Sequence, residues 1–343
     1  MASASKQETM KAIVQDDYGA APEHVLRFAE VARPNVEDDE VLVRVRAASV
    51  DRGTWHVMAG LPYPIRVAGF GLRRPHAPNP GRSLAGTIEA VGKDVTEFKP
   101  GDEVYGTTEG AFAEYASARA GRSPARLPAG ALAPKPANVS FEQAAAVPVS
   151  ALAALQAVRD QAQVQAGERV LVIGASGGVG TFAVQIAKAF GAEVTGVAST
   201  AKADLVRALG ADHVVDYTRE DIADGGHRYD ALVDVGGNRR LSHLRRALMP
   251  RGRLVIVGGE TDGRWLAGND RQLRARLLSP LVSQKLATFV SSENADDLMA
   301  IREIVGSGRL APAIDRTYPL SETPAAVRYV QNGRARGKVV IAM

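Results

Sequence analysis

Three glycines mark the stretch of this sequence with the strongest chemical signal. Gly174, Gly177 and Gly180 follow a short apolar run at 170–173. After them come apolar residues with helical spacing and a second apolar run at 194–197. This order predicts a strand, a sharp turn, a helix and a second strand. At such a turn the backbone can approach a pyrophosphate, and the helix directs its free N–H groups and positive dipole end at the phosphates.

The spacing of these glycines departs from the plain GxGxxG pattern, so a tight turn without a ligand is the alternative. Because all four elements fall in register, we favour a dinucleotide site. The residues of the turn that we assign to the cofactor are Ser176, Gly177, Gly178 and Val179.

The next informative position comes about twenty residues after the glycines. NAD-specific sites place an Asp or Glu there to hold the ribose 2′-hydroxyl. Here the stretch reads Ser199, Thr200, Ala201 and Lys202, without a carboxylate. Two hydroxyls and an ammonium suit a 2′-phosphate, so we expect NADPH rather than NADH. A solvated lysine at a helix start is the alternative for Lys202. Tyr217, at the end of the expected third strand, would flank the same end of the cofactor.

Glycines also follow the expected fourth and fifth strands. The pairs Val235 and Gly236, and Val257 and Gly258, stand where the backbone would pass the nicotinamide half of the cofactor. Simple turns at strand ends are the alternative. We complete the cofactor set with Lys338, at the start of the tail strand.

The elements before the glycine turn predict a mainly β domain. Short strand-like runs, separated by glycine and proline, occur at 12–14, 41–45, 86–91, 103–105 and 111–116. Many short strands of this kind indicate a partly open antiparallel barrel. Residues 60–80 carry five prolines and predict a long irregular loop, which in compact domains is often functional.

From about residue 131 the sequence predicts alternating strands and helices. Ser140 predicts an N-cap, with Glu142 in the first turn of a helix interrupted near Pro148. We expect further helices at 201–209, 239–248 and 295–305, and strands at 213–216, 231–235, 253–257 and 286–290. Repeated βα units predict a doubly wound parallel sheet with ligands at the carboxyl ends of its strands. The tail at 337–342 is a final strand that we expect to return to the first domain.

Length, composition and charge argue against several other kinds of site and partner. The 343 residues are enough for about two domains and contain no cysteine, which excludes disulfides and thiolate zinc sites. A net charge of +4 without a run of five like charges argues against nucleic acid as a partner, although the pI is 9.3. No apolar run is long enough for a membrane span. The polar start at 1–9 indicates a frayed leader and a cytoplasmic protein.

Several motifs of this chain resemble those of the medium-chain dehydrogenase/reductase superfamily. The resemblance is to its zinc-independent branch, which contains quinone oxidoreductase-like and enoyl-reductase-like proteins. The resemblance covers nearly the whole chain from Met10. The motifs are AASVDRGTW (47–55), PGRSLAG (80–86), VGKDVTEFKPGDEVYG (91–106), GAFAEYA (110–116), AAAVPVSALAA (144–154), VLVIGASGGVG (170–180) and GKVVI (337–341). The resemblance implies an α/β protein with a GroES-like, mainly β catalytic domain and a doubly wound Rossmann domain. It also implies NADPH as the cofactor and a cleft between the two domains. We place the catalytic domain at 10–135, the Rossmann domain at 136–290 and the return to the catalytic domain at 291–343.

Some positions depart from the family pattern. Members often have Asn where Asp51 stands, Asp or Glu where Ser83 stands and Thr where Ala153 stands. Zinc-dependent members use cysteine and a Gly-His-Glu motif, whereas this chain has Gly-Arg-Ser at 81–83 and no cysteine. We therefore expect no metal, and we interpret His56 as a structural or surface residue.

Without a metal, the resemblance implies hydride transfer from NADPH to a quinone or an α,β-unsaturated carbonyl compound. The protein must orient this small molecule, polarise its carbonyl and supply a proton. The catalytic candidates are Asp51, Thr54 and Tyr63. Tyr63, in the sequence LPYP, is the preferred hydrogen-bond donor to the substrate oxygen, with packing on the prolines as the alternative. Asp51 has a rival role in binding the nicotinamide ribose or backbone, as the family residue does. Trp55 and Phe70 would shape an apolar pocket.

Two other functions stay open. One is an enoyl-thioester reductase whose anionic carrier would use Arg271, Arg274 and Arg276. The other is a non-catalytic NADPH-binding protein, such as a redox sensor or a structural protein. We also expect a homodimer if 286–290 is an unprotected edge strand.

Overall fold

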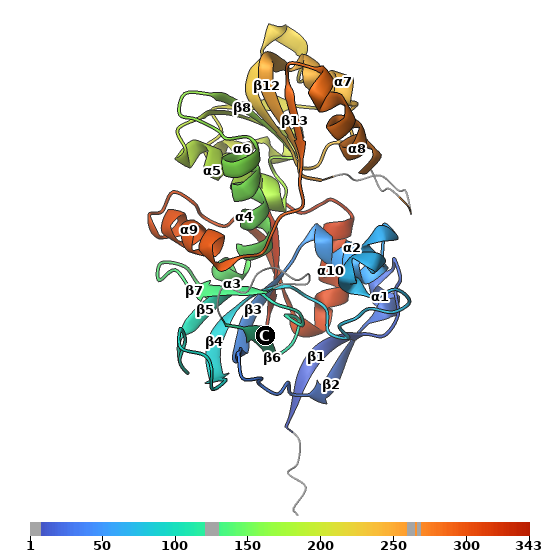
Figure 1. The fold of residues 1–343 in the computed structure, drawn as a ribbon, viewed down its shortest axis with the longest axis vertical. Helices are drawn as coiled ribbons and strands as arrows, with labels where there is room; N and C mark the ends of the chain where they lie inside the picture. Colours follow the sequence, from blue (N-terminus) through green and yellow to red (C-terminus); the bar gives the residue numbers. More distant parts are fainter. Residues whose placement is uncertain (1–7, 121–129, 259–264, 266–268) are drawn as a thin grey trace, which may run out of the picture.

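The computed structural model describes residues 8–120, 130–258, 265 and 269–343. Figure 1 shows a lower body built mainly of strands and an upper body in which helices flank a sheet. The leader expected at 1–9 lies outside the described residues up to residue 7, and Thr9 already begins strand β1. No helix in the described part of the chain is long and apolar enough to cross a membrane.

The lower body is built mainly on antiparallel pairs. Among the described residues, β1 (Thr9–Gln15) pairs with β2 (Leu26–Ala32), and a larger sheet has the order β14, β15, β3, β4, β5, β7, with β6 paired to β3. The strands of this larger sheet are β3 (Glu40–Val50), β4 (Ser83–Val91), β5 (Glu103–Thr107), β6 (Tyr115–Arg119), β7 (Ala131–Pro134), β14 (Ile314–Pro319) and β15 (Lys338–Ala342). In β3, Val43 and Val45 are buried while Arg44 and Arg46 are exposed. This alternation is the half-exposed pattern that the sequence predicted.

The prediction of a strand at 111–116 is largely wrong. Strand β6 begins only at Tyr115, and the residues before it contribute a single bridge, between Ala113 and Ala12. Phe112 is fully buried and lies under Gly81, where an added Cβ would come within 2.7 Å of it. The stretch is apolar because it packs into the core, and this burial gave it the appearance of a strand.

The tail of the chain returns to the lower body, as expected. Strand β15 pairs antiparallel with β3 and parallel with β14. The first and last parts of the chain therefore complete one sheet. The domain limits at 135 and 290 stay predictions.

The upper body contains the predicted doubly wound sheet. In the described residues its order is β10, β9, β8, β11, β12, β13, and every pair is parallel. The strands are β8 (Arg169–Ile173), β9 (Glu193–Ala198), β10 (His213–Asp216), β11 (Tyr229–Asp234), β12 (Leu248–Ile256) and β13 (Lys285–Thr288). The chain turns back at β8, so the carboxyl ends of β8 and β11 border a crevice where ligands bind in this fold.

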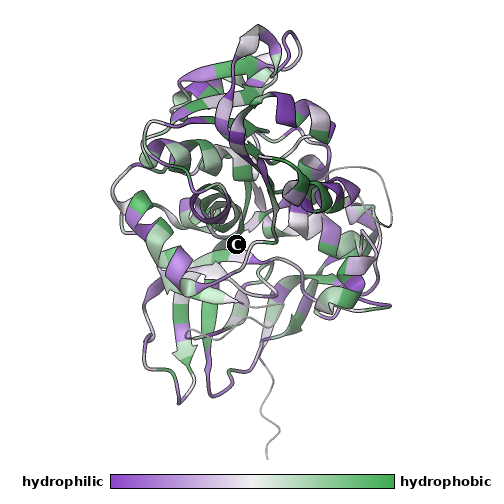
Figure 2. Cartoon of the chain, turned by 45° about the horizontal axis from the view of Figure 1, so that its top comes forward, coloured by the Kyte–Doolittle hydropathy of each residue, from purple (hydrophilic) through white to green (hydrophobic). Residues whose placement is uncertain are grey.

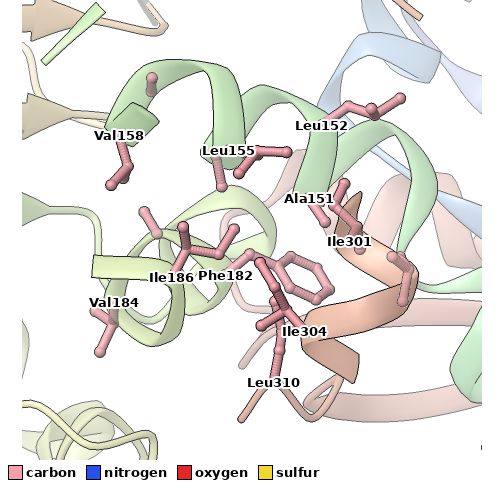
Figure 3. Close-up of a cluster of buried hydrophobic side chains, with 14 of the residues drawn as sticks. Ala151, Leu152, Leu155, Val158, Phe182, Val184, Ile186, Ile301, Ile304 and Leu310 are labelled. Atoms are coloured by element: carbon pink, nitrogen blue, oxygen red, sulfur yellow. The ribbon is translucent and has the colours of Figure 1, made fainter. Parts of the chain in front are cut away.

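Both faces of this sheet are buried. Figure 3 shows Phe182 and Ile186 of α5 between Leu155 of α4 and Ile304 of α9. The opposite face packs against α7 and α8 through Leu244 and Ala275. In Figure 2 the apolar colour accordingly gathers inside and polar colour dominates the outer segments. Burial on two faces explains why the parallel strands are apolar without alternation.

The helices largely follow the predicted signals. Ser140 caps α3 in a capping box with Gln143, and Pro148 opens α4 after the expected interruption. The helices are α1 (Pro22–Val25), α2 (Arg52–Ala59), α3 (Phe141–Ala145), α4 (Pro148–Leu155), α5 (Gly178–Ala189), α6 (Ala203–Ala208), α7 (Leu241–Arg246), α8 (Asn269–Leu278), α9 (Ala295–Gly306) and α10 (Thr323–Gln331). Helices α6 and α7 are shorter than the apolar pattern indicated, because a 3-10 turn and the extended residue Arg240 precede them.

The proline-rich loop at 60–80 contains only a short π-helical turn, Arg66–Phe70, which is broken at Gly69. The hydroxyl of Tyr18 donates to the carbonyl oxygens of Phe70 and Gly71, both at 2.7 Å, and Arg66 stacks on the Tyr18 ring. These contacts hold the loop against the lower body without regular structure.

Candidate functional site

The glycine turn leaves the start of helix α5 open for an anion. Gly177 is the N-cap, and no side chain caps the helix within the described residues. A Cβ on Gly180 would lie 2.0 Å from the carbonyl oxygen of Gly174, whose own φ is +79°. Only glycine fits at these two positions. The first N–H groups of α5, at Gly178 and Val179, are therefore available for phosphate oxygens.

The ends of the fourth and fifth strands lie beside this turn. A Cβ on Gly174 would come within 3.0 Å of the backbone nitrogen of Gly236, and one on Gly258 within 2.6 Å of the carbonyl oxygen of Val235. The predicted residues Val235, Gly236 and Gly258 thus border the same crevice as the glycine turn, and Val257 is joined to β11 by a hydrogen bond to Asp234.

A buried ion pair supports these strand ends. Asp234 is fully buried, and its Oδ2 lies 2.7 Å from Nη1 of Arg271. Burial raises the pKa of Asp234 to about 6, although Arg271 opposes the shift. Arg271 also donates to the carbonyl oxygen of Gly258 at 3.0 Å. Arg271 therefore anchors helix α8, whereas Arg274 and Arg276 of the same basic segment are exposed.

The residues expected at the adenosine end gather at the ends of β9 and β10. Thr200 donates a hydrogen bond to the carboxylate of Asp216, and Tyr217 next to it is 53% exposed. Hydrogen bonds from Thr200 and Thr218 lower the pKa of Asp216 to about 2. Ser199 precedes this group as a half-buried residue. An anion at this end would meet the Asp216 carboxylate beside Thr200.

Lys202 makes contacts that the sequence did not predict. Its Nζ donates to the carbonyl oxygens of Gly333, at 3.1 Å, and Ala335, at 2.8 Å. Burial lowers its pKa, the nearby Arg336 acts in the same direction, and Asp315 opposes both. The turn after α10 therefore brings a second cation beside Lys202. The signal in the sequence was the basic stretch Arg-Ala-Arg at 334–336.

Four polar side chains meet where the two bodies touch, and we call them the seam cluster: Ser83, Asp51, Ser150 and Lys338. Each is at least 90% buried. Lys338 Nζ forms an ion pair with Asp51 Oδ1 and donates to Ser150 Oγ at 2.9 Å. Ser150 Oγ donates to Asp51 Oδ1 at 2.6 Å, and Ser83 Oγ donates to Asp51 Oδ2 at 3.2 Å. The Lys338 ammonium and the Asp51 carboxylate neutralise each other. One N–H of Lys338 has no partner in the described residues.

Several elements place Asp51 in this cluster. It directly follows strand β3 and is the N-cap of α2, in a capping box where Thr54 Oγ1 accepts from its backbone N–H at 3.3 Å. The sequence assigned Asp51 and Lys338 to the site but not to each other. Ser150 was missed, although a serine inside an apolar, alanine-rich helix was a usable signal.

The seam cluster touches the glycine turn. A Cβ on Gly178 would lie 3.3 Å from Ser150 Oγ and 3.4 Å from Lys338 Cδ. The backbone N–H of Gly337 donates to the carbonyl oxygen of Ser176 at 2.9 Å. A phosphate at the start of α5 would therefore face groups of both bodies.

Tyr63 lies apart from this cluster. Its ring contacts Trp265 edge to face, with ring centroids 5.2 Å apart, and Arg66 lies 5.0 Å from the ring centre. Its hydroxyl forms no hydrogen bond within the described residues. Trp55 contacts His56 and donates to the carbonyl oxygen of Ala20 at 3.3 Å.

A hollow of about 40 Å³, partly open to solvent, lies under the proline-rich loop. Thr54 and Val57 of α2, Phe70 of the loop, Arg82 and Glu109 are among its lining residues. Phe70 thus has the pocket role expected of it. Arg82 and Glu109 were not predicted for the site.

Two family models match the chain. One, described as the alcohol dehydrogenase GroES-like domain, covers residues 37–129, and one described as zinc-binding dehydrogenase covers 209–341.

Similar proteins match over nearly the whole length. The chain is 32% identical to an NAD(P)H oxidoreductase, RTN4IP1, mitochondrial, of Mus musculus, over 99% of this chain and 90% of that protein. It is 30% identical to an NADPH-dependent alkenal/one oxidoreductase, chloroplastic, of Arabidopsis thaliana, over 99% of this chain and 81% of that protein. The solved quinone oxidoreductase from Coxiella burnetii has a TM-score of 0.79 and 27% identity, over 98% of this chain and 100% of that one.

The residues do not fit the zinc named in one family description. The chain has no cysteine, and the described residues hold no group of three His, Asp or Glu side chains that could bind a metal. Asp51 is already neutralised by Lys338.

The seam cluster gives a stability prediction. We expect Lys338→Met to lower the free energy of unfolding by about 3–5 kcal/mol, because it leaves Asp51 buried without its cation. Urea unfolding of the protein without cofactor measures the change.

The matched control is Lys93→Met, which breaks the ion pair of Lys93 with Asp38, 2.7 Å apart, whose side chains are 71% and 63% exposed. That change should cost less than about 1 kcal/mol. Equal losses in the two variants would contradict the role of the seam cluster.

Proposed function

Since the chain belongs to the medium-chain dehydrogenase/reductase superfamily, in its quinone oxidoreductase-like branch, we propose that it is an NADPH-dependent oxidoreductase. Its substrate is a small quinone or α,β-unsaturated carbonyl compound. The observation that carries the proposal is the contact between the uncapped start of α5 and the seam cluster, beside which the hollow opens. A dinucleotide and a small molecule would meet at this junction.

The cofactor would be held by the groups around the crevice. They are Ser176, Gly177, Gly178 and Val179 of the turn, Ser199, Thr200, Lys202 and Tyr217 at the adenosine end, and Val235, Gly236, Val257, Gly258 and Lys338 at the nicotinamide end. The bound nicotinamide supplies the hydride. The partner-free N–H of Lys338 is available to a cofactor oxygen, while its ion pair fixes the position of the ammonium.

The three catalytic candidates take different parts in the proposal. Asp51, as the ion-pair partner of Lys338, orients the groups around the nicotinamide end. Thr54 lines the hollow and turns its hydroxyl to the backbone of Asp51. Tyr63 would offer its hydroxyl to a substrate oxygen from the loop side, with its ring held by Trp265.

The choice of NADPH over NADH rests on charge. The stretch at 199–202 has no carboxylate, and Arg336 adds a second cation beside Lys202. Asp216 next to Thr200 opposes a phosphate there. We therefore assign the 2′-phosphate to the side of Lys202 and Arg336.

We also propose that the reaction needs no zinc, because the donor set does not fit the metal and the seam cluster supplies its own cation. A cytoplasmic location stays a prediction.

A homodimer is the third part of the proposal. Strand β13 is the last strand in the described order of its sheet. Leu273, Leu277 and Leu281, spaced by four residues on and just after α8, are 57%, 66% and 79% exposed. An apolar stripe beside an open strand edge suits pairing across a two-fold axis.

We expect steady oxidation of NADPH that depends on a quinone or an enone. The test follows the loss of reduced nicotinamide over a panel of quinones, enones and enoyl-CoA esters, before and after dialysis against a chelator. Preference for enoyl-CoA would favour the enoyl-thioester reductase, whose carrier would then meet Arg274 and Arg276. Tight NADPH binding without turnover on the whole panel would point to the non-catalytic protein, and loss of activity on chelation would refute zinc independence.

Lys202→Ala should weaken NADPH binding about tenfold or more and change NADH binding less than about twofold, because only NADPH carries the 2′-phosphate. Titration calorimetry with both nucleotides measures this. Arg336→Ala, which leaves the carbonyl contacts of Lys202 intact, should show the same selectivity. Equal weakening of both nucleotides by Lys202→Ala would mean that the lysine is only structural.

Leu277→Asp should convert a dimer to a monomer, because it places a charge in the apolar stripe. Sedimentation velocity at micromolar concentration measures the mass in solution. Leu72→Asp is the control, since Leu72 is 68% exposed but lies in the proline-rich loop. A monomeric unchanged protein would refute the proposed dimer.

A further inference from the structure

The hollow under the proline-rich loop adjoins the seam cluster. Thr54, which lines it, accepts a hydrogen bond from the backbone of Asp51. Arg82, which also lines it, directly precedes Ser83, whose hydroxyl donates to Asp51. A molecule in the hollow would therefore lie next to the groups to which the proposed function assigns the nicotinamide end.

One carboxyl group that lines the hollow forms no hydrogen bond with any described residue. The side chain of Glu109 is half-buried and forms no hydrogen bond to any of them. The other carboxyl group nearby, that of Glu293, accepts two hydrogen bonds from Arg82, one of them at 3.0 Å. Arg82 and Glu293 thus neutralise each other, and Glu109 has no cation of its own.

The partial burial of Glu109 favours its protonated form. Burial raises its pKa above the usual value for a glutamate. Arg82 and His76 oppose this shift, and Glu293 adds to it. Glu109 therefore keeps its proton to higher pH than an exposed glutamate does, which a general acid near neutral pH requires.

The other candidates are less suited to give a proton. Asp51 forms an ion pair with Lys338, and its two oxygens accept hydrogen bonds from Ser83 and Ser150. The hydroxyl of Thr54 is an alcohol that does not ionise in the physiological range. Tyr63 is not among the residues that line the hollow.

We propose that Glu109 is the proton donor of the reduction, acting on an α,β-unsaturated carbonyl compound bound in the hollow. This inference rests on the proposed function. The hydride brings two electrons to the β-carbon, and the carbon–carbon π bond breaks. The electron pair left on the α-carbon takes the proton from the Glu109 carboxyl group, whose O–H bond breaks. The resulting carboxylate takes a proton from water, at the side where His76 is exposed.

The decisive variant is Glu109→Gln, which keeps the shape of the side chain and removes the acid. We expect kcat on an enone to fall about 100-fold or more, with NADPH affinity within twofold of the unchanged protein. In the unchanged protein kcat/KM should fall as pH rises through the pKa of Glu109, and this fall should be absent from the variant. Glu109→Asp should restore part of the activity.

A second measurement does not depend on turnover. Infrared difference spectra against pH should show a protonated carboxyl group that loses its proton at higher pH than a free glutamate and is missing from Glu109→Gln. Glu97→Gln is the matched control, because Glu97 is an exposed glutamate at a turn of the lower body; it should change neither the rate nor this infrared band.

The outcomes separate the two proposals. If the unchanged protein reduces enones and Glu109→Gln does so within threefold with the same pH profile, Glu109 is not the donor although the proposed function stands. Absence of the infrared band would overturn the assignment of a retained proton. If the unchanged protein turns over no enone or quinone, the proposed function fails and the role of Glu109 fails with it.

Discussion

The ion pair between Asp51 and Lys338 is the constraint on which the rest of the structure depends. A charge taken out of water is costly unless a partner and hydrogen bonds meet it. Asp51 can be buried only if Lys338, Ser83 and Ser150 reach it together. This requirement brings strand β15, helix α4 and the start of α2 to one point, and that point lies against the glycine turn. The seam cluster therefore contacts both the glycine turn and Thr54, a residue that lines the hollow.

The same constraint separates the roles of the acidic groups. Asp51 forms an ion pair with Lys338 and accepts hydrogen bonds from Ser83 and Ser150, so both of its oxygens are engaged. Glu109 forms no hydrogen bond with the described residues, and burial raises the pKa of its carboxyl group. Asp234 shows the same effect at the other side of the crevice, where burial outweighs Arg271 and raises its pKa. Carboxyl groups of one protein thus differ in their properties because their surroundings differ.

Local patterns predicted the local structure well. Each local signal lies within fewer than about fifteen consecutive residues. This holds for the glycine turn, the buried strands and the capped start of α3. The pairing of Asp51 with Lys338 joins positions 287 residues apart, and no spacing in a single sequence encodes it. Glu109 was not predicted for the site, because its burial and the pairing of Arg82 with Glu293 arise only in the folded protein. The false strand at 111–116 arose in the same way, since apolar residues record burial whether or not they pair.

The pairing of β15 with β3 has a consequence for the order in which the protein forms. Strand β3 is synthesised long before its partner β15. The described strands of the upper sheet all lie between residues 169 and 288, so they are synthesised before β15. The edge of β3 that β15 covers stays unpaired until β15 is made. An unpaired strand edge is open to wrong pairing with other chains, so late pairing of β15 lengthens the time in which the lower sheet can aggregate.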